Sequence, residues 1–116
     1  MEMIGYAVKN GFFEYMNKHH SFLDEISLLS REQLDSILDT PNERELCERA
    51  IRFFHNEAIY LKDHTVYYEN KLKQATYAMR IEDYQIYLAP QEGNPFIPFL
   101  QRIYRNFVIM KKKEDM

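Results

Sequence analysis

The stretch that decides the fold class runs from Asn42 to Ala89 and reads NERELCERAIRFFHNEAIYLKDHTVYYENKLKQATYAMRIEDYQIYLA. It contains no glycine, and no proline lies between Pro41 and Pro90. Strand-rich folds place such turn residues roughly every 8–12 positions, so their absence favours helices. With 116 residues the chain has the size of one domain. We therefore predict a single all-α domain over residues 1–116, an irregular bundle of about four to six helices.

The first half of this stretch has the pattern of one long amphipathic helix. Thr40 and Pro41 stand where an N-cap and a first helical residue belong, and Glu43 occupies the third helical position. Apolar residues recur at helical spacing along one face, which comprises Leu46, Cys47, Ala50, Ile51, Phe53, Phe54, Ala58 and Leu61. These features predict a helix from about Pro41 to Lys62.

The second half, residues 66–89, fits two alternative structures. As a helix it has two apolar sides, one with Tyr68, Leu72, Ala75, Met79 and Ile86 and the other with Val66, Tyr77, Ile81, Tyr84 and Leu88. As a hairpin it alternates apolar and polar residues on both sides of a turn at Glu82-Asp83. We favour the helix because Glu-Asp is a poor sequence for a two-residue turn. The alternative fold is α+β, with a small hairpin near residues 76–89.

Three helices are predicted before this stretch and one after it. The first runs from about Met3 to Lys18, the second from Ser21 through Leu29, and the third from the capping box at Ser30 to about Leu38. The last begins near Asn94 and Pro95 and ends in Lys111–Lys113, where cations suit the helix dipole. Its apolar face comprises Phe96, Phe99, Leu100, Ile103, Tyr104, Phe107 and Met110.

Charge and cysteine content limit the environment and the partners. The net charge of −3 argues against nonspecific binding of nucleic acid by the whole surface. The charge is uneven, because residues 1–58 carry 6 basic and 11 acidic side chains and residues 59–116 carry 9 basic and 7 acidic ones.

Cys47 is the only cysteine, which fits a reducing compartment. The first residues lack the pattern of a signal peptide, and apolar runs are far shorter than the roughly 20 residues of a membrane helix. We expect a cytoplasmic protein.

No motif for catalysis or metal binding is present in the sequence. The histidines and Cys47 lack metal-ligand spacing, and no phosphate-binding glycine loop or nucleophile motif occurs. Cys47 lies on the apolar face of its predicted helix, where a small buried thiol is expected. Glu57 lies on the same face, as a rim carboxylate or as a partly buried one with a raised pKa. We expect no enzyme, cofactor or metal; an active site assembled from Glu57, His55 and Tyr60 ranks last.

By elimination, the sequence favours a non-enzymatic protein–protein interaction module, such as a small regulatory, adaptor or inhibitor protein. The expected partner-binding residues are Tyr77, Ile81, Tyr84 and Leu88. Tyrosine is enriched in protein interfaces, and if the opposite apolar side of the predicted helix packs against the core, this side must be buried by a partner. Self-association through the stripe, as a homodimer, is included in this hypothesis. Full burial of a central helix is the competing interpretation.

A nucleic-acid-associated regulator is the alternative function. It would use the basic residues of the predicted C-terminal helix, Arg102, Arg105, Lys111, Lys112 and Lys113. The competing interpretation is a solvated helix face with a basic C-terminal tail whose positive charge suits the helix dipole. We favour it because the basic residues are few and the other half of the chain is acidic.

Overall fold

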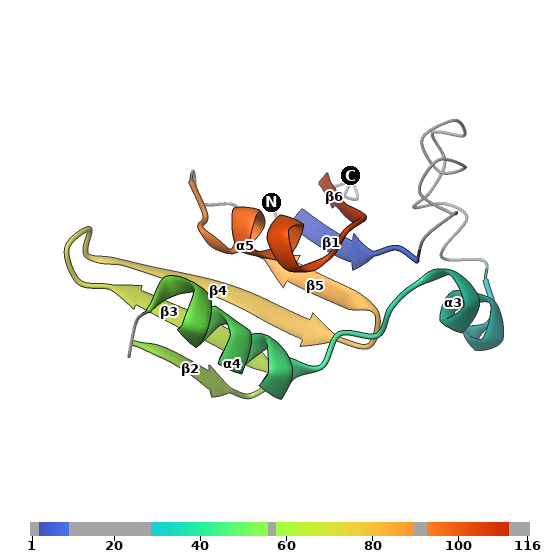
Figure 1. Ribbon diagram of the computed structural model, residues 1–116, viewed down its shortest axis with the longest axis horizontal. Coiled ribbons are helices and arrows are strands. Elements are labelled where there is room, and N and C mark those ends of the chain that lie inside the picture. The colour runs from blue at the N-terminus through green and yellow to red at the C-terminus, as the bar shows by residue number, and fades with distance from the viewer. Residues whose placement is uncertain (1–2, 10–28, 56–57, 90–92, 112–116) are drawn as a thin grey trace, which may run out of the picture.

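The computed structural model describes residues 3–9, 29–55, 58–89 and 93–111. Within these ranges the chain forms a six-stranded antiparallel sheet and three helices, shown in Figure 1. The order along the chain is β1 (Met3–Ala7), α3 (Arg31–Ile37), α4 (Glu43–Phe54), β2 (Ile59–Lys62), β3 (Thr65–Asn70), β4 (Ala75–Glu82), β5 (Gln85–Leu88), α5 (Phe96–Ile103) and β6 (Phe107–Lys111). The predicted all-α helical bundle is therefore wrong.

The sheet has the strand order β2-β3-β4-β5-β1-β6, and α4 and α5 pack on one of its faces. Helix α4 contacts β2 and β3, and α5 contacts β4. The main core lies between these helices and the sheet, and its fully buried members include Ala50, Val66, Met79, Ile86, Leu88, Phe96, Phe99 and Leu100. The result is a two-layer α+β domain in which one face of the sheet is covered by helices.

Helix α4 is shorter than the predicted helix over residues 41–62. It begins after Asn42, whose side chain accepts a hydrogen bond from the backbone N–H of Glu45, so Asn42 is the N-cap rather than Thr40. It ends at His55, whose φ of 48° is left-handed. The chain then enters β2, where β-branched and aromatic residues suit a strand that the neighbouring β3 can pair. Local capping therefore starts this helix, and strand pairing ends it.

The hairpins form without glycine because other residues adopt the left-handed conformation. Lys62 pairs with Thr65 around a two-residue turn, in which Asp63 and His64 have φ of 50° and 62°. Asp and His are among the non-glycine residues that tolerate positive φ best. Gln74 and Asp83 have positive φ in the next two hairpins. The lack of glycine and proline in residues 42–89 thus excludes neither turns nor strands.

Residues 75–88 form the hairpin of the alternative fold, with β4 and β5 paired around a turn. Glu82 pairs with Gln85, so the two turn residues are Asp83 and Tyr84, one position later than expected. Tyr77, Met79 and Ile81 alternate toward the helix-covered face. The favoured helix over residues 66–89 is wrong, because period-two alternation and pairing with neighbouring strands determine the structure here.

The flanking predictions have mixed outcomes. The capping box is confirmed, because Ser30 accepts from the N–H of Gln33 while the Gln33 side chain accepts from the N–H of Ser30. Residues 3–7 form an interior strand, next to the last strand of the sheet, instead of the start of a helix. Residues 10–28, which include most of the first two predicted helices, lie outside the described ranges. The last helix ends at Ile103, and residues 107–111 form β6, so Lys111 lies in a strand and not in a helix.

Candidate protein-interaction surface

The face of the sheet away from α4 and α5 carries a second set of side chains, because successive residues of a strand point to opposite faces. Over β2 to β5 this set comprises Tyr60, Lys62, Thr65, Tyr67, Glu69, Thr76, Ala78, Arg80, Glu82, Gln85 and Tyr87. The two helices with the most contacts to β2, β3 and β4, which are α4 and α5, pack on the other face. We call Tyr60, Tyr67, Arg80 and Tyr87, which lie on four neighbouring strands, the aromatic row.

Toward β1 this face is covered. Ile4, Tyr6 and Val8 form a second buried cluster with Ile37 and Leu38, at the end of α3. Backbone hydrogen bonds fix this region, since Asp39 N–H donates to the carbonyl of Ala7 and Lys9 N–H to that of Ile37. The accessible part of the face is therefore the part over β2, β3 and β4.

At the outer end of the aromatic row two tyrosines are held together. Tyr60 pairs with Tyr67 across β2 and β3, and their rings stack with centroids 5.3 Å apart and an interplanar angle of 25°. The Tyr60 hydroxyl donates to the Glu69 carboxylate at 2.9 Å, and this hydrogen bond is the main cause of the raised pKa of Tyr60. Tyr60 stays 41% exposed. The two rings are thus ordered and accessible before any partner binds.

At the inner end, Arg80 and Tyr87 form a cation–π pair. The guanidinium carbon of Arg80 lies 4.2 Å from the centroid of the Tyr87 ring, and Arg80 Nη1 lies 2.5 Å from an oxygen of Glu82. The Tyr87 hydroxyl donates to the side-chain oxygen Oε1 of Gln85. The side-chain nitrogen Nε2 of Gln85 donates in turn to the Tyr6 hydroxyl at 2.9 Å. These contacts anchor the row to the buried cluster beneath α3.

The four predicted partner-binding residues are buried within this chain. Tyr77, Ile81 and Leu88 belong to the main core beneath α4 and α5. Tyr84 belongs to the second cluster, and its hydroxyl donates to Asp35 in α3. They do not form a common stripe, because the segment is a hairpin and not a helix. We therefore do not assign the contact surface to them.

The five predicted basic contacts are divided between different parts of the chain. Arg102 lies in α5 and Arg105 follows it, and both side chains are exposed. The backbone of Lys111 lies in β6 opposite Met3. Lys112 and Lys113 lie outside the described residues. The structure thus brings no described pair of these residues onto one continuous helix face.

Residues considered for chemistry are also separated. Among the described residues, no group of three or more His, Cys, Asp or Glu could hold a metal ion. Cys47 is buried, and desolvation raises the pKa of its thiol, which disfavours the reactive thiolate. His55 ends α4 with an exposed side chain, Tyr60 belongs to the aromatic row, and Glu57 lies outside the described ranges.

An open groove of about 530 Å³ lies at the N-terminus of α4, between the two-residue turns of the sheet. Its lining includes Glu43 and His64, whose side chains meet at 2.7 Å. The hydrogen bond with Glu43 raises the pKa of His64. The described lining of the groove thus contains a hydrogen-bonded pair of an imidazole and a carboxylate.

The sequence contains a signal for the aromatic row that helical periodicity conceals. Tyr67 and Glu69 alternate with Val66 and Tyr68, and Ala78 and Arg80 alternate with Tyr77 and Met79. Period-two patterns of this kind are typical of strands with one covered face.

No helix in the described part of the chain is long and apolar enough to span a membrane. No protein-family model matches the chain, and no curated protein is significantly similar to it in sequence.

Proposed function

We propose that this chain is a non-enzymatic protein–protein interaction module, a small regulatory, adaptor or inhibitor protein. The surface that binds the partner is the aromatic row with its surrounding polar residues. The observation that carries this proposal is the accessible position of Tyr60, Tyr67 and Arg80 on the face of the sheet that α4 and α5 leave open.

The residue types of the row support a protein partner. Tyrosine and arginine are the side chains most often found, with tryptophan, at energetically dominant positions of protein interfaces. Here they are ordered in advance, since Tyr60 stacks on Tyr67 and Arg80 lies over Tyr87. A side chain that is already immobilised loses less entropy when a partner binds.

The charges of this face favour a protein over a nucleic acid. Arg80 lies beside Glu82, and Glu69 accepts a hydrogen bond from Tyr60. Acidic groups among the aromatic side chains repel phosphates, and nucleic-acid surfaces require unpaired cations. We place the module in the cytoplasm, because Cys47 is the only cysteine in the chain.

Site-specific photocrosslinking tests the proposal. A photoreactive phenylalanine derivative replaces Tyr67 in the row or Arg52 on the exposed side of α4, and both variants are expressed in the native cells. We expect a defined protein adduct from position 67 and none from position 52. The purified partner should then bind the Tyr67→Ala variant at least about tenfold more weakly than the wild type, with the Arg52→Ala variant unchanged.

Two results would overturn this function. The first is an absence of protein adducts from position 67, including adducts between two copies of this chain. The second is an adduct with nucleic acid at that position, together with binding that weakens steeply as salt rises, which would support the alternative of a nucleic-acid-associated regulator.

A further inference from the structure

Among the strands of the described residues, β2 lies at one end of the sheet, and its backbone has a defined outer edge. Figure 1 shows it as the outermost strand, beside β3 and beneath α4. Glu69 N–H donates to the carbonyl of Ala58 at 3.0 Å, and Lys62 pairs with Thr65 at the two-residue turn. In an antiparallel ladder only alternate residues bond to a given neighbour, so Ala58, Tyr60 and Lys62 bond toward β3. The peptide groups of Ile59 and Leu61 therefore point outward.

The side chains near this edge leave apolar area accessible on both faces of the sheet. Tyr60 is 41% exposed on the open face. On the other face, Ile51 of α4 is 38% exposed. Phe53 contacts Phe99 of α5 at 5.3 Å, and Ile51 lies about 200° away from Phe53 around the helix. Ile51 thus projects on the side of α4 that is away from α5, which is the side of β2.

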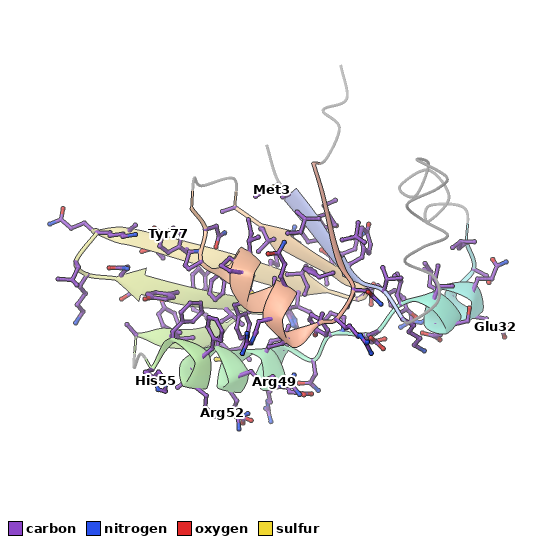
Figure 2. The ribbon with its side chains drawn as sticks, turned by 45° about the horizontal axis from the view of Figure 1, so that its top comes forward. Met3, Glu32, Arg49, Arg52, His55 and Tyr77 are labelled. Carbon is purple, nitrogen blue, oxygen red and sulfur yellow. The ribbon has the colours of Figure 1, made fainter. Side chains whose placement is uncertain are left out.

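Two arginines of α4 lie farther around the helix than Ile51, Arg52 by about 100° and Arg49 by about 160°. Figure 2 shows Arg49, Arg52 and His55 along the side of α4 that is turned away from the sheet. The large apolar side chains of α4 that stay exposed are Ile51 and Phe53.

From this edge we infer that two copies of the chain dimerise by antiparallel pairing of their β2 strands. The inference rests on the proposed function and names its partner as a second copy. Two conditions restrict the register. Hydrogen-bonded pairs must use the outward peptide groups of Ile59 and Leu61, and residues directly opposite each other must lie on the same face. A two-fold axis at Tyr60 meets both conditions, since Ile59 then faces the partner's Leu61 and Tyr60 faces the partner's Tyr60.

This register extends the aromatic row into the second copy. Tyr60 and the partner's Tyr60 form a non-hydrogen-bonded pair, in which side chains are closest and the Cα atoms lie about 4.5 Å apart. Each Tyr60 already stacks on Tyr67, so the four rings form one row across two subunits. Aromatic cross-strand pairs are among the favourable ones in antiparallel sheets.

The same register joins opposite charges. Lys62 faces the partner's Ala58, whose side chain is a single methyl group. The partner's Glu69 is the next residue across the sheet, on the same face, because Glu69 N–H bonds to Ala58. Lys62 therefore reaches the partner's Glu69, and the two-fold axis repeats this ion pair. Within one chain Lys62 pairs with Thr65 and Glu69 pairs with Ala58, so Lys62 and Glu69 lie at opposite ends of the hairpin. The edge is thus complementary to itself and not merely unpaired.

The mass of the full chain in solution tests the inference. One chain has a mass of 14.1 kDa, and light scattering and sedimentation should give twice that value at micromolar concentration. Lys62→Glu should weaken the dimer by at least about tenfold, because each Lys62–Glu69 pair becomes a repulsion. Glu69→Lys should do the same, and the double variant Lys62→Glu/Glu69→Lys should regain dimerisation. Lys71→Glu, an identical charge change at the exposed β3–β4 turn, should have no effect.

The outcomes separate this inference from the proposed function. A wild-type chain that is monomeric at high micromolar concentration overturns the dimer, as does a dimer that Lys62→Glu leaves unchanged or that the double variant does not restore. In those cases an adduct between position 67 and a different protein still supports the proposed function. Far-ultraviolet circular dichroism of each variant confirms that a change of mass does not come from unfolding.

Discussion

The ring of Phe107 in β6 lies directly over the backbone of Gly5 in the neighbouring strand β1. Gly5 pairs with Ile109, and Phe107 pairs with Ala7, so the ring leans along the strand over the neighbouring position. A Cβ atom on residue 5 would lie 2.2 Å from the nearest ring carbon, which is far inside van der Waals contact. The absence of a side chain at Gly5 is thus what allows Phe107 to cover this part of the sheet.

Gly5→Ala should destabilise the fold by about 1–3 kcal/mol, the usual cost of overpacking a filled interior. Urea unfolding measures the change. The double variant Gly5→Ala/Phe107→Leu should recover part of the loss, because the shorter side chain leaves the position above residue 5. A double variant no more stable than Gly5→Ala would mean that the contact with the ring is not the cause.

Two leucines distinguish the hairpin from a helix over residues 66–89. Leu88 is fully buried in the main core, whereas Leu72 is 99% exposed in the β3–β4 turn. Leu88→Ala should lower the free energy of unfolding by about 2–5 kcal/mol through the loss of buried contacts and the resulting cavity. Leu72→Ala should change it by less than about 0.5 kcal/mol. The reverse ranking in thermal or urea unfolding would contradict the strand assignment.

The N-cap of α4 is Asn42 and not Thr40, and this difference is measurable. Asn42→Ala removes the hydrogen bond to the N–H of Glu45 and should cost about 0.5–2 kcal/mol. Thr40→Ala should have a smaller effect, since Thr40 lies two residues before the cap. Equal losses of stability for the two variants in urea unfolding would argue against this start of the helix.

His64 and Glu43 should give one histidine a distinctive titration. The hydrogen bond with Glu43, then the charge of Glu43, raises the pKa of His64 above its ordinary value of 6.5. A raised pKa in the folded state stabilises the fold at pH values below the unfolded pKa, and this contribution is lost as the pH rises through the folded pKa. Glu43→Gln should return the His64 pKa toward 6.5 in an NMR titration. A titration unchanged by Glu43→Gln would show that the ion pair does not form.

Local signals in the sequence predict local structure well. The capping box of Ser30 and Gln33 correctly gives the start of α3, and the apolar spacing of Leu46, Cys47 and Ala50 correctly gives the buried face of α4. Both depend on interactions within a few residues of the chain, which a pattern can describe.

The strands depend on information that the pattern lacks. Asp63 and His64 form a tight turn without glycine, and the apolar residues of β3 and β4 fit a helical period almost as well as a strand period. The choice is made by cross-strand neighbours such as Val66 with Met79 and Tyr68 with Tyr77. Period-two alternation marks single members of the aromatic row, but which of them lie side by side depends on the alignment of four strands.

The position of β1 between β5 and β6 has a consequence for how the chain folds. Met3 pairs with Leu88 on one side and with Lys111 on the other. Contacts between residues so far apart in sequence slow folding, because a long loop must close before they form. During synthesis β1 leaves the ribosome well before either neighbour exists, whereas β2 to β5 pair with their neighbours along the chain. We expect the β2–β5 meander and α4 to assemble first, and the insertion of β1 between β5 and β6 to limit the rate of folding.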